Sequence, residues 1–306
     1  MTATIIDTAA WADAAPALSI LIPFYRDDPG RLLETLDCAR GAFEIVALDD
    51  GSGDPELAAY VARTIRGLRN PARFVRLKTN EGRARGRNRL AGEARGRHLL
   101  FLDSDMLPDE WDFVGRWLEL AANADPAVAF GGFSLDQAPR TRANAVHRAL
   151  ALRSDCLPAA ERRRSPEKYV FTSNLLIRRD VFEAEPFDAG FVGWGWEDVE
   201  WGMRVSRRHE IVHVDNPATH LGLTPARTMA AKFEQSAANF ARVVAAHADI
   251  VSAYPSYRLA RALKRAPLIG LWRPWLKAAA LVELAPAQFR AFALRLYRAA
   301  LYAEAV

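Results

Sequence analysis

The sequence predicts an α/β fold, with a mostly parallel, Rossmann-like central sheet, flanking helices and a C-terminal helical extension. Three observations favour this fold class. Short apolar runs alternate with segments of helical periodicity between residues 17 and 105, which is typical of a parallel sheet covered by helices on both faces. Acidic residues directly follow two of these runs, where open α/β sheets bind ligands. Beyond residue 224, apolar residues recur at helical spacing only.

The first third of the chain supplies most of the predicted sheet. The strands are expected within residues 17–25, 43–54, 72–80 and 96–105, and the helices within residues 31–40, 55–68 and 81–94. Asp54 is suited to cap the second helix, because Pro55 follows it at the first helical position. A glycine-bearing loop opens the third helix.

The alternation loosens after residue 105. Two further strands are expected within residues 127–135 and 171–182, on either side of a polar stretch. The basic cluster Arg162–Arg164 in that stretch is interpreted as a solvated loop, with a clamp for an anionic substrate as the alternative. The helical region has two predicted apolar stripes: Met229, Phe233, Phe240 and Val244, and then Phe289, Phe292 and Leu296.

These patterns divide the chain into three parts: a flexible N-terminus (residues 1–16), an α/β domain (17–224) and a basic helical region (225–306). No uncharged apolar run approaches the ~18 residues that a membrane span needs, and the N-terminus lacks the basic start of a secretory signal. Cys38 and Cys156 are too few and too far apart for a disulfide framework or a cysteine metal site. We therefore expect a cytoplasmic protein with reduced thiols.

The charge of the chain is concentrated at its C-terminal end. Residues 251–306 hold nine basic side chains against Glu283 and Glu304, although the whole chain has a net charge of only +4. Trp272 and Trp275 alternate there with basic residues, as in helices that lie on an anionic membrane. A helical cap with a solvated basic face is the alternative, and peripheral membrane contact is slightly favoured. Nucleic acid is not an expected partner, because no recognition motif accompanies the basic residues.

Two acidic pairs predict a ligand site. Asp103 and Asp105 are two residues apart, so both side chains leave the same face of an extended segment. Two converging carboxylates suit a hard divalent cation, which takes oxygen ligands and completes its shell with substrate phosphates. A solvated turn at a strand end is the alternative. Asp49 and Asp50 end another strand, and the arginines of the segment NEGRARGRN could neutralise phosphate at a helix start.

Six motifs in series carry a family resemblance: ILIPFYR, ALDDGSGD, NEGRARGRN, LFLDSDM, NLLIRRDVFE and FDAGFVGWGWEDVEWGMR. Together they resemble the inverting nucleotide-sugar glycosyltransferases of family 2, over roughly residues 17–222. The resemblance implies a GT-A fold, with residues 17–224 as the catalytic domain. It also implies metal-dependent transfer of a hexose or N-acetylhexosamine from a UDP-sugar, with Mn²⁺ or Mg²⁺ as cofactor. The implied acceptor is a glycan or lipid-linked saccharide in cell-surface polysaccharide synthesis, at the inner face of the cytoplasmic membrane.

The resemblance also implies which residues bind the nucleotide. Pro23 and Tyr25 would lie beside the base, and the ring of Tyr25 is suited to stack on a pyrimidine. Asp50, or its neighbour Asp49, would accept a hydrogen bond from the base. Arg87 would contact the nucleotide or its phosphates.

For the metal, the resemblance implies that Asp103 faces the ribose and that Asp105 ligates the ion bridging the diphosphate. His220 would complete the metal site, although a lone histidine is as often structural. The further acid that often follows the D-x-D motif of the family is absent, since Met106 occupies that position. The identity of the donor is therefore left open.

The GWGWED segment resembles the acceptor motif of bacterial polysaccharide transferases and galactosyltransferases. Asp198 would be the catalytic base, while Glu197, Trp194 and Trp196 would shape the acceptor pocket. A positioned carboxylate is chemically suited to this role, because a sugar hydroxyl is a poor nucleophile until its proton is removed. The alternatives are that Asp198 caps a helix and that the tryptophans are core residues.

Two other functions are weighed against the transferase. A nucleotidyltransferase would share the sheet and the metal, but it has no use for the GWGWED segment. A catalytically inactive nucleotide-sugar-binding or scaffold protein is the alternative outside the enzymes. The joint presence of Asp103, Asp105 and Asp198 favours the enzyme.

Overall fold

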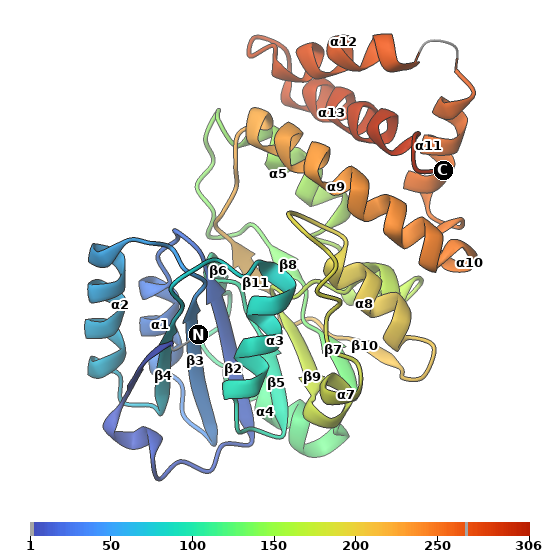
Figure 1. Ribbon diagram of the computed structural model, residues 1–306. Coiled ribbons are helices and arrows are strands. Elements are labelled where there is room, and N and C mark those ends of the chain that lie inside the picture. The colour runs from blue at the N-terminus through green and yellow to red at the C-terminus, as the bar shows by residue number, and fades with distance from the viewer. Residues whose placement is uncertain (1–2, 267–268) are drawn as a thin grey trace.

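The computed structural model describes residues 3–266 and 269–306, and within them it forms a mixed α/β domain beneath a layer of helices (Figure 1). The central sheet has the strand order β1-β4-β3-β2-β5-β9-β7-β10. Strands β4, β3, β2 and β5 are parallel, whereas β9 runs antiparallel to both β5 and β7. The bounds are β1 (Thr4–Asp7), β2 (Leu18–Phe24), β3 (Phe43–Asp49), β4 (Ala72–Arg76), β5 (His98–Phe101), β7 (Val128–Phe130), β9 (Leu175–Arg178) and β10 (Ile211–His213).

Helices cover both faces of this sheet, as predicted. Successive residues of β2 point to opposite faces: Ile20 and Ile22 pack with α1, α2 and α4, while Leu21 packs with α3, α7 and α8. Both faces are apolar, which is why the strands read as continuous hydrophobic runs. The helices are α1 (Gly30–Asp37), α2 (Pro55–Gly67), α3 (Arg83–Glu93), α4 (Phe113–Ala124), α5 (Ala145–Ser154), α6 (Ala159–Arg162), α7 (Arg179–Ala184) and α8 (Glu197–Val205). The Asp54 carboxylate caps α2 by accepting from the backbone N–H groups of Glu56 and Leu57.

The N-terminal segment is not flexible over its whole length, so the prediction for residues 1–16 is wrong from residue 4 onward. Residues 1–2 lie outside the described part of the chain. Strand β1 pairs antiparallel with β4, and Arg73 forms an ion pair with Asp7 at 2.8 Å. Trp11 is buried, with the guanidinium of Arg95 stacked 3.9 Å from its ring centroid. The pairing is tertiary, so four residues of sequence gave no local signal of it.

A second, three-stranded sheet connects distant segments at the edge of the site. Its order is β6-β11-β8, with β6 (Met106–Pro108), β8 (Phe133–Ser134) and β11 (Ala218–His220). His220 pairs in register with Met106, the residue that follows Asp105. This pairing brings His220 beside the D-x-D segment across more than a hundred residues of sequence.

The C-terminal helices form a layer above the carboxyl ends of the parallel strands, and α5 packs among them (Figure 1). Within residues 3–266 and 269–306 the C-terminal helices are α9 (Ala226–Ala246), α10 (Ala248–Val251), α11 (Pro255–Lys264), α12 (Ile269–Leu281) and α13 (Ala287–Tyr302). None of the helices within residues 3–266 and 269–306 combines the length and the apolar composition of a membrane span.

The two predicted apolar stripes of this layer have different outcomes. Met229, Phe233 and Phe240 are buried on α9, which confirms the first stripe. The second stripe is wrong, because Phe289 and Phe292 are 53% and 55% exposed. The buried face of α13 consists of Arg290, Ala291, Ala293, Leu294 and Tyr297, in addition to residues of its last turn. Its small alanines allow close contact with the neighbouring helices, and the larger phenylalanines remain outside.

The basic cluster Arg162–Arg164 also differs from its interpretation as a solvated loop. Arg162 ends α6 and is 2% exposed, with its guanidinium donating to Nδ1 of His213 and to the carbonyl oxygens of Leu157 and Val214. Burial lowers its pKa to about 10. Arg163 donates to the carbonyl oxygen of His213. Arg162 and Arg163 therefore tie α6 to β10, so the interpretation as a solvated loop is wrong for Arg162, whereas Arg164 is exposed beyond the end of α6 as predicted.

Candidate active site

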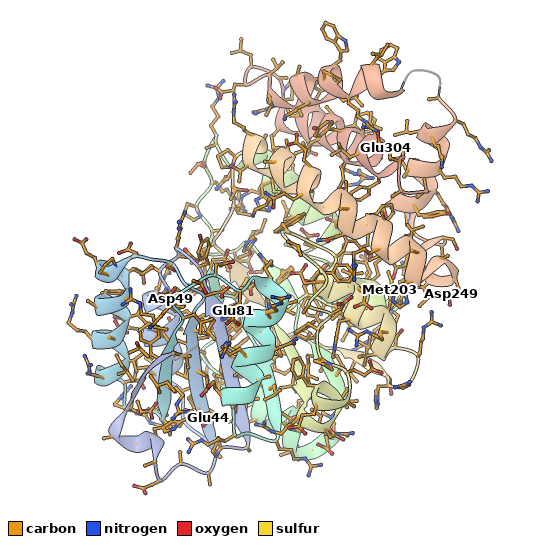
Figure 2. All side chains as sticks on the ribbon, viewed as in Figure 1. Glu44, Asp49, Glu81, Met203, Asp249 and Glu304 are labelled. Carbon is orange, nitrogen blue, oxygen red and sulfur yellow. The ribbon has the colours of Figure 1, made fainter. Side chains whose placement is uncertain are left out.

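One cavity of about 1330 Å³ lies between the carboxyl ends of the parallel strands and the helical layer. Figure 2 places Asp49 and Glu81 at this end of the sheet, whereas Glu44 lies at the opposite end. Every predicted site residue except Asp49 lines the cavity: Pro23, Tyr25, Asp50, Arg87, Asp103, Asp105, Trp194, Trp196, Glu197, Asp198 and His220. Side chains from five of the six motifs, together with His220, thus share one space.

The structure distinguishes the two acids that end β3. Asp49 is fully buried below the cavity, where its Oδ1 accepts from the backbone N–H of Ser52 at 2.8 Å. The prediction that Asp49 contacts the nucleotide is therefore wrong. Asp50 faces the cavity and accepts from the backbone N–H groups of Glu81 and Gly82, at 2.8 and 3.0 Å. Burial raises the pKa of Asp50 above its usual value.

An ion-pair network links the start of α3 to the start of α8. The Arg87 guanidinium donates to Oδ1 of Asp103 at 2.7 Å, and Arg83 donates to Oε1 of Glu197 at 2.8 Å. Arg87 is only 2% exposed, so this geometry favours a role in positioning Asp103 over direct contact with the nucleotide. Arg83 is the more accessible arginine, with 41% of its side chain exposed. Sequence reasoning noticed the arginines of this segment but selected only Arg87.

Asp105 and His220 form a close pair in the cavity, with Nε2 of His220 3.2 Å from Oδ2 of Asp105. Burial disfavours the charged form of Asp105, but His220, Arg83 and Lys232 outweigh it and lower the pKa of Asp105 below its ordinary value. Burial likewise opposes the charging of His220, and the hydrogen bond to Asp105 outweighs it and raises the pKa of His220. Each group thus favours the charged form of the other.

The residues around this pair fit a divalent cation that is shared with a substrate. A Cβ atom at Gly222 would overlap Oδ2 of Asp105 and lie 3.1 Å from Nε2 of His220, so the glycine keeps the space beside both atoms open. No three histidine, cysteine or acidic side chains converge on one point within residues 3–266 and 269–306. Two protein ligands suit Mg²⁺ or Mn²⁺, which take part of their shell from water and substrate phosphates.

Two further residues near this pair were missed by sequence reasoning. Lys232 of α9 lines the cavity close enough to Arg83, Asp103 and Asp105 to interact with their charges, and burial lowers its pKa. Asp27 lines the same wall and accepts from the Ser104 hydroxyl at 2.7 Å. Neither had a signal in the sequence, because Lys232 lies outside the recognised motifs and Asp27 belongs to the loop after β2.

Asp198 lies in the first turn of α8 and faces the cavity. Burial raises its pKa to about 7, and the neighbouring charge of Glu197 contributes in the same direction, while Arg87 and Arg83 oppose the rise. The residue at the N-cap position is Trp196, and no side chain caps the helix there. Among the residues that the structure describes, the one group that donates to the Asp198 side chain is the backbone N–H of Val199, at 2.8 Å. A carboxylate with a near-neutral pKa is suited to general base catalysis.

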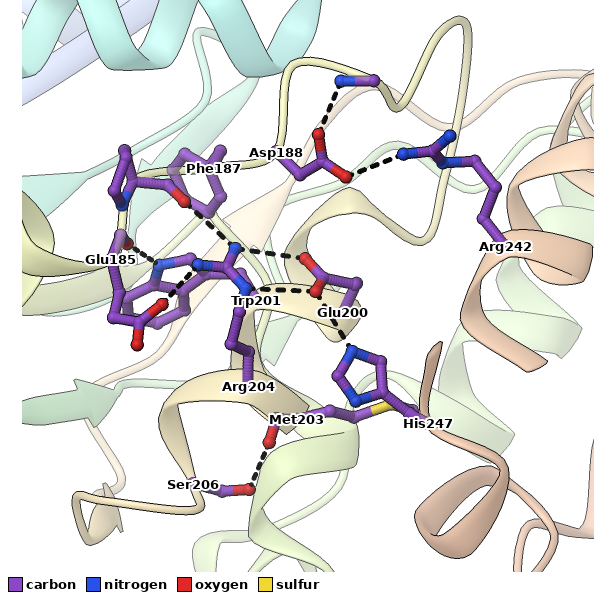
Figure 3. Close-up of polar contacts among 12 residues, drawn as sticks. Glu185, Phe187, Asp188, Glu200, Trp201, Met203, Arg204, Ser206, Arg242 and His247 are labelled. Atoms are coloured by element: carbon purple, nitrogen blue, oxygen red, sulfur yellow. Dashed lines mark hydrogen bonds and ion pairs between the residues drawn. The ribbon is translucent and has the colours of Figure 1, made fainter. Parts of the chain in front are cut away.

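A set of polar contacts fixes α8 in place (Figure 3). Arg204 forms ion pairs with Glu185 at 2.7 Å and with Glu200 at 3.1 Å, and Glu200 in turn contacts Nε2 of His247 at 3.1 Å. Trp201 donates its indole N–H to the carbonyl oxygen of Glu185. These contacts hold α8 against α7 and the helical layer, so Asp198 is carried on a rigid element.

The two tryptophans of the GWGWED segment differ in their surroundings. Trp196 donates its indole N–H to the Tyr302 hydroxyl at 2.9 Å, and its ring centroid lies 4.9 Å from that of Phe240. It therefore anchors the segment to α9 and α13, although it also borders the cavity. Trp194 packs on Phe233 at the cavity wall, which leaves it better placed to meet an acceptor.

The chain is similar in sequence to known glycosyltransferases. The family described as Glycosyl transferase family 2 matches residues 19–185. An uncharacterized glycosyltransferase, YfnE of Bacillus subtilis (strain 168), is 24% identical over 65% of this chain and 65% of its own length. TuaG of the same organism, a candidate teichuronic acid biosynthesis glycosyltransferase, is 30% identical over 39% of this chain and 48% of its own length. The matched regions thus span less than two thirds of either relative.

Solved structures support the fold. The mannosyltransferase PcManGT from Pyrobaculum calidifontis, in complex with GDP-Man and Mn²⁺, superposes with a TM-score of 0.55 at 15% identity, covering 94% of this chain and 88% of its own. S. aureus TarS, residues 1–349, has a TM-score of 0.52 at 14% identity, covering 94% and 89%. TarS in complex with UDP-GlcNAc has a TM-score of 0.51 at 15% identity, covering 94% and 90%. The GT-A-like fold expected from the sequence is thereby confirmed.

Proposed function

Since this chain belongs to glycosyl transferase family 2, we propose that it is a metal-dependent, inverting transferase that moves a hexose or N-acetylhexosamine from a UDP-sugar. One observation carries the proposal. Asp198, with its near-neutral pKa, faces the same cavity as the Asp105–His220 pair, although the three residues come from distant parts of the chain. A base that activates the acceptor hydroxyl and a metal site that stabilises the departing diphosphate together support a direct displacement at a sugar carbon.

In this mechanism each group of the cavity has a separate task. Asp105 and His220 would hold Mn²⁺ or Mg²⁺, and the ion would neutralise the negative charge that develops on the departing diphosphate. Arg83 and Lys232 add positive charge on the same side. Asp198 takes the proton of the acceptor hydroxyl as the oxygen attacks the anomeric carbon and the bond to the nucleotide diphosphate breaks. A single displacement inverts the configuration of the sugar.

The sugar nucleotide is assigned to one end of the cavity and the acceptor to the other. Tyr25, with 44% of its surface exposed, is free to stack on the base, while Asp50 and Asp103 would hold the nucleoside. Trp194 borders the acceptor, a glycan or lipid-linked saccharide of a cell-surface polysaccharide. TarS in complex with UDP-GlcNAc and the GDP-Man complex of the mannosyltransferase support a sugar nucleotide as donor, and TuaG supports a polysaccharide as the product.

A donor screen tests this function directly. We expect the purified chain, with Mn²⁺, to release free nucleotide from one or a few sugar nucleotides in a panel of UDP- and GDP-linked sugars. With a saccharide acceptor present, the glycoside product should have the opposite anomeric configuration to the donor, as measured by NMR. Retention of configuration would contradict the mechanism. Donor binding without turnover of any sugar would instead favour a nucleotide-sugar-binding scaffold.

Membrane contact through the helical layer is part of the proposal, with the inner face of the cytoplasmic membrane as the place of action. Seven large apolar side chains between residues 271 and 292 are half or more exposed: Leu271, Trp272, Trp275, Val282, Leu284, Phe289 and Phe292. The adjacent helix α11 adds three exposed basic residues, Arg258, Arg261 and Lys264, and its C-cap residue Arg265 is also exposed. Apolar side chains beside basic ones match the interface of an anionic bilayer.

We expect the full-length chain to co-sediment with anionic vesicles at low salt and to be released as salt increases. Replacing Trp272 and Trp275 with alanine should weaken binding by about tenfold or more, because each buried indole contributes roughly 1.5–3 kcal/mol. Trp111→Ala is the matched control, since Trp111 is 92% exposed but belongs to the opposite, α/β part of the molecule. Failure of the wild-type chain to bind anionic vesicles at low salt excludes membrane contact.

A further inference from the structure

Three arginines on the helical wall of the cavity have no role in the proposed mechanism. Arg153 lies at the end of α5, and Arg295 and Arg298 lie on α13; all three border the cavity. Within residues 3–266 and 269–306, none of these three guanidinium groups forms an ion pair or donates a hydrogen bond to the protein. Arg83 and Arg87 in the same cavity are both paired with carboxylates. We refer to Arg153, Arg295 and Arg298 as the arginine cluster.

The arginine cluster is electrostatically uncompensated. Burial lowers the pKa of Arg295, and the positive charges of Arg153 and Arg298 lower it further. Asp155 is close enough to Arg298 to interact with its charge, and it accepts from the Ser154 hydroxyl at 2.7 Å. Burial raises the pKa of Asp155 and so disfavours its charged form. An anion between the three guanidinium groups would relieve their repulsion and meet five N–H donors from each.

The cluster lies beside the residue that borders the acceptor. Arg298 lies 5.0 Å from the Phe233 ring centroid, and Phe233 packs on Trp194 with a centroid distance of 6.1 Å. Asp155, which interacts with the charge of Arg298, also interacts with that of His220. The test therefore fills the donor end with UDP and Mn²⁺ before the charged group is offered.

From this placement we infer that Arg153, Arg295 and Arg298 bind a negatively charged group of the acceptor, either a phosphate or a carboxylate. The inference rests on the proposed function, and it adds that the acceptor is anionic. Guanidinium groups recognise both kinds of oxyanion through paired N–H donors. The two sources of charge are therefore distinguished by experiment.

Binding of small glycosides to the full-length chain tests the inference. Methyl β-D-glucoside, methyl β-D-glucuronide and methyl β-D-glucoside 6-phosphate are titrated separately by saturation-transfer NMR, with UDP and Mn²⁺ present to fill the donor end. We expect one or both charged glycosides to bind about tenfold or more tightly than the neutral one. The comparison between glucuronide and phosphate identifies the preferred group.

Removing the charges should remove this preference. We expect Arg295→Gln/Arg298→Gln to reduce affinity for the charged glycoside by about tenfold or more, to the level of the neutral one, whose affinity should not change. Arg153→Gln provides a second variant, because Arg153 is exposed and its loss leaves the packing intact. Arg63→Gln/Arg66→Gln is the matched control, since both arginines are exposed on α2 and neither borders the cavity.

Three results would overturn the inference: equal binding of all three glycosides, an anion preference that survives both arginine variants, or anion binding that UDP and Mn²⁺ abolish. The last result would assign the cluster to the donor. UDP binding and circular dichroism are measured in parallel and establish that the arginine variants remain folded. A wild-type chain that releases nucleotide from no donor refutes the proposed function, and that outcome is read separately from glycoside binding.

Discussion

Asp198→Asn is expected to reduce the rate of sugar transfer by about 10²- to 10⁴-fold, the usual contribution of a positioned general base. The amide preserves the size of the side chain and its hydrogen bond from Val199, but it cannot accept the proton of the acceptor hydroxyl. Because donor binding does not need this proton transfer, the affinity for UDP should stay within about twofold of the wild type. Initial rates and UDP titrations measure the two quantities.

The pH dependence of the wild-type reaction should report the ionisation of Asp198. The pKa of Asp198 is raised to about 7, and the ionised form is the base, so kcat/KM should rise with pH up to about 7 and then level off. Asp136→Asn is the matched control, because Asp136 is exposed and does not border the cavity. Full activity of the Asp198→Asn enzyme would refute the assignment of the base.

Glu197→Gln should move that pH profile toward lower pH. The charge of Glu197 is the largest contribution, after burial, to the raised pKa of Asp198. Its removal also leaves Arg83 without its carboxylate at 2.8 Å, so the arginine charge acts on Asp198 with less opposition. Both changes stabilise the ionised base, and the acid limb of the profile should shift downward. If the acid limb of the profile stays in place or moves to higher pH, Glu197 does not raise the pKa of Asp198.

Most of the sheet could be predicted from the sequence, but much less of the helical layer could. Strands β2, β3, β4 and β5 were predictable because burial on both faces produces continuous apolar runs. Strand β1 was not, because four residues that pair only through β4 have no periodicity of their own. The buried face of α13 was misassigned for a related reason: alanines pack closely enough there to leave Phe289 and Phe292 outside.

The residues of the site show the same difference between local sequence signals and tertiary packing. Asp103 and Asp105 were found from their spacing at a strand end, and Asp198 and His220 from their motif context. Lys232 and the arginine cluster were invisible, because helices that lie outside the motifs carry them into the cavity. Asp49 and Asp50 could not be separated from sequence, since only the turn after β3 decides which carboxylate faces the cavity. Local spacing therefore identified the chemistry, while tertiary packing determined its surroundings.

Gly222→Ala is expected to raise the concentration of Mn²⁺ needed for half-maximal activity by about 10- to 100-fold, as the loss of support for a metal ligand commonly does. The added methyl group would overlap Oδ2 of Asp105, the flexible end of a side chain, so the carboxylate should swing away from His220 while the fold persists. Asp105→Asn should have the larger effect, with metal-dependent transfer nearly abolished. Mn²⁺ binding is followed independently of activity by the loss of the free-ion EPR signal in the presence of UDP.

The control for this substitution is Gly115→Ala on α4, an exposed helical position where a Cβ would meet no atom within 4 Å. Alanine is favoured over glycine in a helix, so this variant should be at least as stable as the wild type, with unchanged metal dependence. Circular dichroism establishes that Gly222→Ala remains folded. If its Mn²⁺ requirement matches that of Gly115→Ala, the space beside Asp105 and His220 is not where the ion binds, and the metal must be held by other groups of the cavity.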